Sequence, residues 1–456
     1  MLLISVFFVN GLLAKEIKVS SQASFDNAIR AALPNDEIVW MTGMYSDIFM
    51  NVTKSNMTIK AKVAGRTIFT GKSRVNVDGS HVKLIGFQFL NGNIEGKNVI
   101  QTKGSDNLFA QINIARYTSG KYLVIKEQCQ RVKVSYCNFE NRLNLHDRNI
   151  VSVLVNEKQP GFHKIEYSSF KNFKGKGGDM GIEPIRIGVS TQKEYSSKSI
   201  VEYCYFTQCN GDGEIISNKA ADNVIRYNTF INNPVSELVL RHGDRASVYG
   251  NFFLNGKGGV RIKEGEHHAV FNNYFSGLKD RSIIVQSTKE DPVRNVVIAH
   301  NTFVKTGGVK LGGSKSDYEP KKIDVINNIF VDPVKSWILN PTGSEVFLGN
   351  MYLGNLGVSS LKGMKRVDTL LEKNKAGFYQ ISSNSPAINA SVSNLLHIPK
   401  NKGVSADETL VYDILKMNRP KSASQKDVGC WEFKQGGEVI PHVSKFNTGP
   451  RYLKKP

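Results

Sequence analysis

The sequence predicts an all-β protein, folded as a right-handed parallel β-helix of roughly a dozen coils. Three observations predict this fold. A phrase recurs every 22 to 28 residues between Phe206 and Phe330, residues alternate as in strands within each phrase, and most repeats carry an asparagine at one fixed position. A period of this length is typical of a solenoid, in which each repeat buries its apolar face only by stacking on its neighbours.

The recurring phrase has two or three alternating residues, then a small or amide residue, then an aromatic residue two positions later. Examples are VEYCYFTQ around Phe206 and IRYNTFIN around Phe230. The phrases are rich in Val, Ile, Tyr and Phe and carry Gly or Asn at their edges, so we expect short strands separated by turns. The aromatic positions are Phe139, Phe170, Phe206, Phe230, Phe253, Phe275, Phe303 and Phe330, with weaker outer members at Phe89 and Tyr352.

An asparagine stands two residues before the aromatic residue in six of these phrases. We expect its side chain to stack as a ladder of amides at one turn of each coil, bonded to the backbone, with the asparagine itself tolerating a left-handed φ. Surface asparagines in unrelated loops would not fall into one register. The six positions are Asn228, Asn251, Asn273, Asn301, Asn328 and Asn350, and Cys or Ser occupies residues 137, 168 and 204.

The two ends of the chain differ from the repeats. SFDNAIRAAL spaces Phe25, Ile29 and Leu33 by four, which predicts a capping helix near 24–33 with Ser24 as N-cap and Pro34 as its stop. The β-helix is expected over 15–355, and 356–456 are expected to form an irregular extension packed on it. Residues 1–14 are nearly all apolar but too short to span a bilayer, so we expect a signal peptide, a secreted or periplasmic protein and no membrane insertion.

The composition indicates a polyanionic partner. The chain has 60 Lys and Arg against 40 Asp and Glu, and the excess is spread along its length. No zinc-finger spacing or aromatic RNA-binding signature is visible, so the sequence favours an acidic polysaccharide over nucleic acid. Five cysteines without a CxxC pair are expected to be buried small apolar residues and neither disulfides nor a zinc site.

One block gathers charged residues of both signs. NGDGEIISNK ends at Lys219, and LRHGD follows one coil later with Arg241. Asp212 and Glu214 should alternate on one face of a strand, and Glu214 and Lys219 should flank a turn. Because Lys219 and Arg241 are 22 residues apart, they should lie side by side in neighbouring coils. Such a cluster is either a proton-transfer site or a surface ion-pair ladder, and the residues alone leave both open.

These motifs resemble polysaccharide lyase family 6, the alginate lyases and chondroitinase B. The resemblance covers roughly Ile38 to Tyr352 and rests on ExxxxK at 214–219, LRHGD at 240–244, GGVRI at 258–262, NNYF at 272–275 and IRIG at 185–188. It implies β-elimination on a uronate polymer with Lys219 as general base and Arg241 as general acid. It also implies that Arg186, His242 and Arg261 hold sugar carboxylates, although His242 could instead support Arg241. The Lys219–Arg241 interval is one residue longer than in the family, which predicts a bulge within 232–236.

The chemistry explains these residue types. Removing the C5 proton of a uronate is feasible only when the adjacent carboxylate is neutralised, and a lysine can be the base once burial and nearby cations lower its pKa. In the family, calcium held by an Asn and two Glu commonly neutralises the carboxylate. Here Asp212 and Glu214 are the tentative ligands, but Met180 stands at the Asn position, and a thioether does not bind a hard cation. If calcium is absent, an arginine or lysine must replace it.

Several substrates and activities stay open at this stage. Alginate is preferred because the region around Arg241 looks more like the alginate-cleaving members. The alternatives are a dermatan sulfate lyase, a uronan C5-epimerase, a glycosidase using Asp212 and Glu214 as its carboxylate pair, and a non-catalytic β-helix that binds an acidic glycan. The sequence does not determine mannuronate against guluronate preference, endo or exo action, or oligomeric state.

Overall fold

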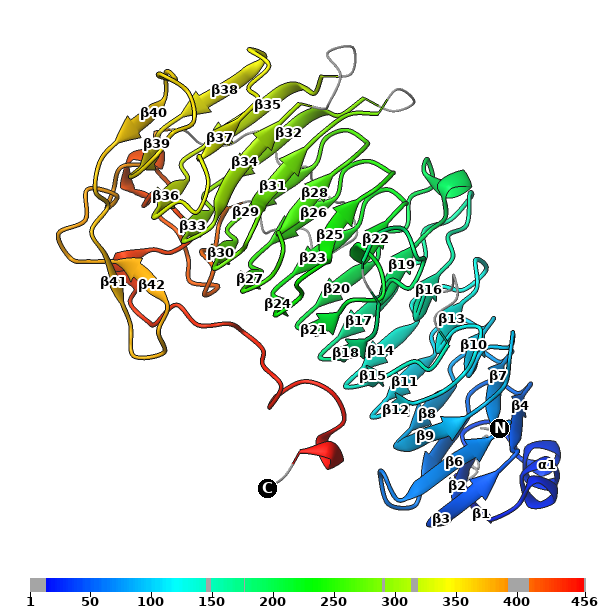
Figure 1. The fold of residues 1–456 in the computed structure, drawn as a ribbon. Helices are drawn as coiled ribbons and strands as arrows, with labels where there is room; N and C mark the ends of the chain where they lie inside the picture. The colour runs from blue at the N-terminus through cyan, green and yellow to red at the C-terminus, as the bar shows by residue number, and fades with distance from the viewer. Residues whose placement is uncertain are drawn as a thin grey trace, which may run out of the picture.

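The protein is described by a computed structural model that covers residues 14–144, 149–175, 177–288, 292–312, 319–392 and 410–454. Residues 1–13, where most of the expected signal peptide falls, lie outside these ranges. The chain winds as a parallel β-helix with three long sheets, which Figure 1 shows as one elongated stack of coils. The predicted fold is therefore confirmed. Within the described residues, no helix is long and apolar enough to cross a membrane.

Each complete coil contributes one strand to each of three sheets, here called A, B and C, and the partial coils at the ends add further strands to A and B. Sheet A has 14 strands: β1 (Glu16–Val19), β2 (Glu37–Trp40), β5 (Thr58–Ala61), β8 (Lys83–Ile85), β11 (Leu108–Ala110), β14 (Lys133–Ser135), β17 (Lys164–Glu166), β20 (Ile200–Glu202), β23 (Val224–Arg226), β26 (Ser247–Tyr249), β29 (Ala269–Phe271), β32 (Arg294–Ala299), β35 (Lys321–Ile326) and β38 (Glu345–Leu348). Sheet B has 14 strands: β3 (Gly43–Ser46), β6 (Thr67–Gly71), β9 (Phe87–Gly92), β12 (Asn113–Ala115), β15 (Asn138–Glu140), β18 (Ser169–Phe173), β21 (Tyr205–Cys209), β24 (Thr229–Ile231), β27 (Phe252–Leu254), β30 (Tyr274–Ser276), β33 (Thr302–Val304), β36 (Ile329–Val331), β39 (Asn350–Tyr352) and β40 (Met364–Arg366). Sheet C has 12 strands: β4 (Phe49–Val52), β7 (Arg74–Val77), β10 (Ile100–Thr102), β13 (Leu123–Ile125), β16 (Val151–Val153), β19 (Ile185–Ile187), β22 (Glu214–Asn218), β25 (Glu237–Leu240), β28 (Val260–Ile262), β31 (Arg281–Val285), β34 (Gly307–Leu311) and β37 (Ile338–Leu339).

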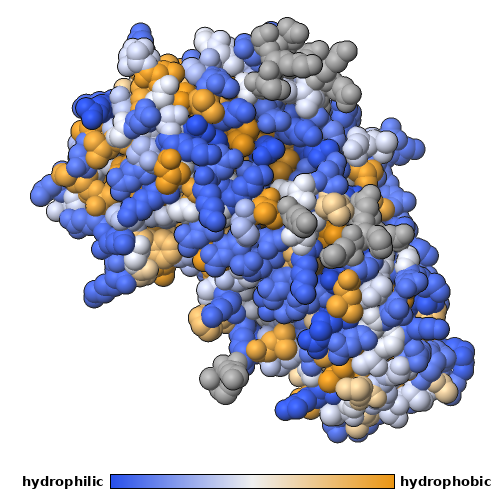
Figure 2. All heavy atoms as spheres, in the orientation of Figure 1, coloured by the Kyte–Doolittle hydropathy of each residue, from blue (hydrophilic) through white to orange (hydrophobic). Residues whose placement is uncertain are grey.

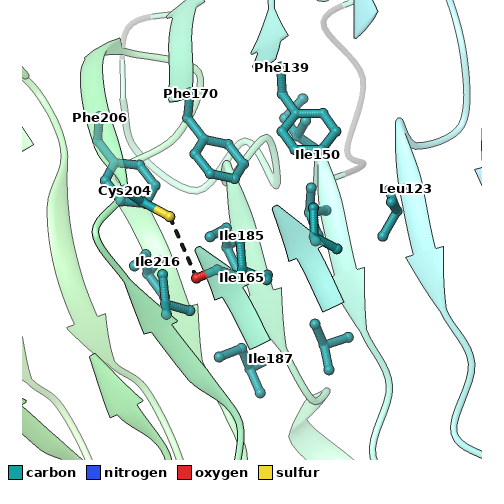
Figure 3. Packing of buried hydrophobic residues seen from close by; sticks show 14 of the residues in the cluster. Leu123, Phe139, Ile150, Ile165, Phe170, Ile185, Ile187, Cys204, Phe206 and Ile216 are labelled. Carbon is teal, nitrogen blue, oxygen red and sulfur yellow. Dashed lines mark hydrogen bonds between the residues drawn. The ribbon is translucent and has the colours of Figure 1, made fainter. Parts of the chain in front are cut away.

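The aromatic residues of the repeat form a continuous stack inside sheet B. Successive rings from Phe170 to Phe253 have centroids 4.7 to 4.9 Å apart and are nearly parallel. This distance equals the spacing between neighbouring parallel strands, so one ring per coil packs on the next without a gap. Figure 3 shows Phe139, Phe170 and Phe206 in this line, above aliphatic residues from the other two sheets.

The asparagine ladder is present as predicted. The Nδ2 group of Asn273 donates to Oδ1 of Asn301 at 3.1 Å and to the carbonyl of Val248 at 2.9 Å, and the same pattern links the six positions from Asn228 to Asn350. The expected left-handed φ at the asparagine itself is wrong. The preceding residue adopts it, for example Tyr227 at 55°. That residue turns the chain at the corner, and the asparagine side chain then points inward and satisfies the buried carbonyls.

Removing one amide from the middle of this ladder should destabilise the protein. We expect Asn273→Ala to lower the free energy of unfolding by about 1 to 3 kcal/mol, because it removes the side-chain oxygen that accepts the buried Asn251 backbone N–H and the amide that donates to the buried carbonyl of Val248. Asn51→Ala, on an exposed strand position, is the matched control and should change it by less than about 0.5 kcal/mol. Denaturant unfolding followed by tryptophan fluorescence measures both. Equal effects would show that the ladder adds no stability.

A short helix, α1 (Gln22–Ala31), covers the open N-terminal end of the solenoid (Figure 1). Its N-cap is Ser21, not Ser24. The Ser21 hydroxyl accepts the Ser24 backbone N–H and the Ser24 hydroxyl accepts the Ser21 N–H, so Ser24 completes a capping box from inside the helix. Leu33 lies beyond the helix and is 52% exposed. The helix ends earlier than expected because the Asp36 carboxylate accepts the Leu33 N–H and begins the turn into β2.

The segment after residue 355 begins as one more turn of the solenoid. β40 pairs with β39 in parallel, and a hairpin of β41 (Leu371–Lys373) and β42 (Tyr379–Ile381) follows. Residues 410–454 then run back along sheet B toward the early coils (Figure 1). This return segment, here called the strap, includes short 3-10 turns at Ala423–Gln425, Phe433–Gln435 and Arg451–Leu453. All five cysteines are buried and unpaired, as predicted.

Candidate functional site

The charged block of the sequence lies on the outer face of sheet C. Arg186 on β19, Ser217 on β22, Val239 on β25 and Arg261 on β28 are partners in register and form one outward row. Such a row presents one side chain per coil at the strand spacing of about 4.8 Å. In Figure 2, hydrophilic residues predominate on the face where these middle strands lie.

Lys219 and Arg241 follow directly after the ends of β22 and β25. The Lys219 N–H donates to the carbonyl of Ile187, and the Arg241 N–H donates to the carbonyl of Asn218, both at 2.8 Å. These bonds place the two side chains at the same turn of adjacent coils, as their spacing predicted. Glu214 and Lys219 flank a strand and not a turn, because β22 occupies the residues between them.

A β-bulge in β22 shifts its register with β25 between Glu214 and Ile216. It precedes Lys219, so it does not account for the longer Lys219–Arg241 interval, and the bulge expected within 232–236 stays a prediction. The 232–236 segment is held by the buried Ser236 hydroxyl, which donates to the carbonyl of Cys209 at 2.6 Å. The bulge brings Glu214 into register with Glu237 on the next coil.

Three buried glutamates each hold one arginine of the site, an arrangement here called the Glu–Arg ladder. Its glutamates come from three successive coils at the start of the sheet C strands, and each arginine projects onto the outer face. The pairs are Arg186 with Glu183 at 2.7 Å, Arg241 with Glu214 at 2.6 Å and Arg261 with Glu237 at 2.6 Å. Glu183 and Glu237 are only 3% and 2% exposed and were not found from the sequence. The one available signal was that Glu237 lies one coil after Glu214.

The Lys219 ammonium stands apart from this ladder. It is half-buried and, within the described residues, no hydrogen bond or ion pair holds it. Burial lowers the pKa of Lys219, and the positive charge of Arg186 lowers it further, against the opposing effect of Glu183. A neutral amine is therefore more accessible here than at an ordinary surface lysine.

His242 is tied to a neighbouring acid. Its Nδ1 forms a close ion pair with the Glu264 carboxylate, and the Thr288 hydroxyl donates to the other Glu264 oxygen at 3.0 Å. Burial works against ionisation of Glu264, but the hydrogen bond from His242 gives a net lowering of its pKa. His242 is thus fixed next to Arg241.

Asp212 and Met180 are not arranged as cation ligands. The Asp212 carboxylate is 2% exposed and accepts the backbone N–H groups of Met180 (2.7 Å), Gly181 and Glu214 (2.9 Å). It precedes β22 and does not share a strand face with Glu214. Burial, with a further contribution from Glu183, raises the pKa of Asp212 to about 6. Met180 is exposed, and its side chain supplies no oxygen.

A cleft of about 180 Å³ opens over this part of sheet C. Four cations and two glutamates contribute to its lining, so the cleft carries excess positive charge and suits a polyanion. Several buried polar atoms have no partner at this site: Oγ of Ser217, Oε2 of Glu214 and Nε of Arg241 and Arg261. Buried polar atoms are normally paired, so the donors among them, the Ser217 hydroxyl and the two Nε–H groups, are positions for an anionic ligand or water. The lining residues are Gly178, Gly213, Glu214, Glu237, Val239, Arg241, Lys257, Arg261 and Lys263.

The chain belongs to the chondroitinase B family, polysaccharide lyase family 6: its sequence matches this family over residues 19–321. No curated protein matches it in sequence. Similar solved structures have the same fold. AlyGC, a PL6 alginate lyase, is 24% identical with a TM-score of 0.74, over 81% of this chain and 55% of AlyGC. A mannuronic acid specific family 6 lyase from human gut microbiota is 23% identical with a TM-score of 0.69, over 78% of this chain and 91% of that one.

A third structure, the alginate lyase AlyF-OU02 in complex with G6, is 18% identical with a TM-score of 0.65. The match covers 81% of this chain and 91% of AlyF-OU02. This chain thus spans about half the length of AlyGC, but most of the length of the other two.

Proposed function

We propose that this protein is a lyase that cleaves alginate by β-elimination, with Lys219 as the base and Arg241 at the leaving oxygen. One observation carries the proposal: an unpaired, half-buried lysine amine lies between two arginines on adjacent coils, and one of them, Arg241, lines a cleft with excess positive charge. A general base needs a neutral amine, and a polyuronate needs cations along its path. Two of the similar structures are alginate lyases and one is a mannuronic acid specific lyase, which favours alginate among the acidic polysaccharides.

The proposed reaction proceeds as follows. Lys219 accepts the proton from C5, the released electron pair forms the C4–C5 double bond, and the bond from C4 to the glycosidic oxygen breaks. Burial acts to lower the pKa of Arg241, but its hydrogen bond to Glu214 produces a net increase. Arg241 therefore stays charged, stabilises the negative oxygen as it departs and relays the proton that this oxygen takes up from water. The products are a shortened chain and a chain with an unsaturated uronate at its end.

Other activities make different products. A dermatan sulfate lyase would use the same groups on a sulfated polymer, and an epimerase would return the proton to C5 without breaking a bond. A non-catalytic binding protein would retain the polymer unchanged. A glycosidase is disfavoured because Asp212 is bound to three backbone N–H groups and Glu214 to Arg241, so neither carboxylate is available for hydrolysis.

Ultraviolet absorbance of the C4–C5 double bond separates these possibilities. Purified protein is incubated with mannuronate-rich alginate, guluronate-rich alginate, dermatan sulfate and pectate. We expect absorbance to rise on alginate. A rise on dermatan sulfate alone would identify dermatan sulfate as the substrate in place of alginate. Altered uronate composition without absorbance would indicate an epimerase. Binding without either change would leave only the non-catalytic reading.

The rate should increase with pH through the pKa of Lys219, because the base acts in its deprotonated form. The charged groups facing this amine are Arg186, Glu183, Glu214 and Arg241. Arg186 lowers the pKa of Lys219, so Arg186→Met should move the midpoint of the pH–rate profile to higher pH. Arg186→Lys, which keeps the charge, should leave the midpoint near its original place. A midpoint that stays fixed or falls in Arg186→Met would contradict Lys219 as the titrating base.

We also propose that the protein is exported. The apolar stretch of residues 1–14 before Lys15 and Glu16 supports this, and an alginate-degrading enzyme must meet its polymer outside the cytoplasm. Amino-terminal sequencing of protein recovered from the periplasm or medium tests it. A mature chain that retains residues 1–14 would argue against a cleaved signal peptide.

A further inference from the structure

We infer that Arg186, fixed by Glu183 and lying beside Lys219, neutralises the substrate carboxylate, and that the reaction needs no divalent cation. This inference rests on the proposed lyase function and names the group that makes proton removal possible. Calcium is the cation that the family resemblance implies, so the first question is whether the residues present could hold it.

Asp212 cannot serve as an open ligand. One of its oxygens accepts the N–H groups of both Met180 and Gly181, and the other accepts the N–H of Glu214. Turning this carboxylate toward the cleft would leave three backbone donors unpaired in a buried place, which is costly because each would lose its acceptor without gaining water. Asp212 instead ties the loop before β19 to the start of β22.

The other residues near Asp212 do not supply the missing calcium ligands. Glu214 gives one oxygen to Arg241, and the Met180 side chain offers only sulfur. Calcium takes six to eight oxygen ligands, as a rule with two or more carboxylates. Within the described ranges, no group of three or more His, Cys, Asp or Glu side chains is placed to hold a metal ion. The residues therefore do not fit a calcium site.

Arg186 is placed to neutralise the substrate carboxylate in place of calcium. It lies on β19 in register with Ser217 on β22, and Lys219 follows two residues after Ser217. The carboxylate of a uronate is attached to C5 itself, so it must lie beside the amine that removes the C5 proton. The two cations that act on the Lys219 amine are Arg186 and Arg241. Since Arg241 is needed at the leaving oxygen, Arg186 remains for the carboxylate.

Glu183 fixes the position of this arginine. Arg186 Nε donates to Glu183 at 3.0 Å, and Nη2 donates to both Glu183 oxygens at 2.8 and 2.7 Å. A guanidinium has five N–H donors in a planar fork, more than one carboxylate can accept, so it can also bind a uronate carboxylate. Glu183 thus acts as a positioning residue: it holds the fork in one orientation before the substrate arrives.

The experiment compares chelator-treated protein with and without added Ca²⁺, by double-bond absorbance on alginate and by thermal unfolding. We expect the rate to change less than twofold and the melting temperature to stay the same. A tenfold loss on chelation that Ca²⁺ restores, or a melting temperature that Ca²⁺ raises, would overturn the inference and leave the lyase function intact. Absence of absorbance in both arms would reject the lyase function instead, while the melting curves would still report on Ca²⁺ binding.

Variants test Arg186 itself. We expect Arg186→Met to lower kcat by 10²- to 10³-fold, with partial rescue by added guanidinium ion. Lys310→Met, on the same outward row farther along sheet C, is the control and should keep kcat within twofold. Thermal unfolding confirms that each variant is folded, and Glu183→Gln, which keeps a hydrogen-bonding side chain, should lower kcat less than Arg186→Met does. Normal kcat in folded Arg186→Met would exclude Arg186 as the neutralising group.

Discussion

Replacing Lys219 with methionine is expected to lower kcat on alginate by 10²- to 10⁴-fold, the usual contribution of a positioned general base. Methionine keeps most of the side-chain volume, and no described partner loses a hydrogen bond, so the fold should be unaffected. KM should change little because the arginines that hold the polymer stay in place. Initial rates of double-bond absorbance over a range of alginate concentrations measure both constants.

Lys263 offers the matched control for this variant. It occupies the same turn one coil beyond Arg241, since its N–H donates to the Leu240 carbonyl at 2.9 Å. Lys263→Met removes an equal charge from the cleft and should raise KM severalfold while leaving kcat nearly unchanged. If both variants raise KM and keep kcat, Lys219 binds the polymer without acting as a base.

Replacing Arg419 with methionine is expected to lower the free energy of unfolding by about 3 to 5 kcal/mol. Arg419 is fully buried in the strap, where it forms an ion pair with Glu432 and donates to Asn272 at 2.9 Å and to the Gly429 carbonyl at 2.8 Å. Without it, the Glu432 carboxylate stays buried and unpaired. Burial already raises the pKa of Glu432 even with the arginine present.

Denaturant unfolding and limited trypsin digestion measure this loss. We expect cleavage within residues 410–454 to become faster, because Arg419 joins the strap to the coil that carries Asn272. Arg366→Met, at an exposed position of β40, is the control and should behave like the unchanged protein. An Arg419→Met protein with unaltered stability would mean that the buried pair contributes nothing beyond its packing.

The fold was predictable because its signal repeats. Each coil must place an aromatic ring and a corner amide at the same point. The pattern of Asn228 and Phe230 therefore recurs in the sequence one coil later, and this recurrence predicts the stacking. The end of the solenoid was less predictable. Ser21 and Ser24 both bond across the helix start, and only the Asp36 turn decides where the helix ends.

The site was predictable only where its residues are separated by one period of the repeat. Lys219 and Arg241 are one period apart, so their proximity followed from the repeat. Glu183 precedes β19 in a loop, and its contact with Arg186 depends on how that loop folds. Asp212 was interpreted as a tentative ligand because it stands where the family has a glutamate, and alternation placed it on one face with Glu214. It precedes the strand and accepts backbone N–H groups instead.

The strap gives the solenoid a connection that its repeats lack. In a stack of coils each unit contacts only its neighbours, so the two ends can melt independently. Here the Cys430 N–H bonds to Thr302 near the last coils, whereas the Tyr452 hydroxyl bonds to the Phe87 carbonyl across 365 residues of sequence. During synthesis the first coils must therefore stay folded without the strap until residues 410–454 have left the ribosome. Because the strap bonds to both early and late coils, we expect them to unfold together once it has closed.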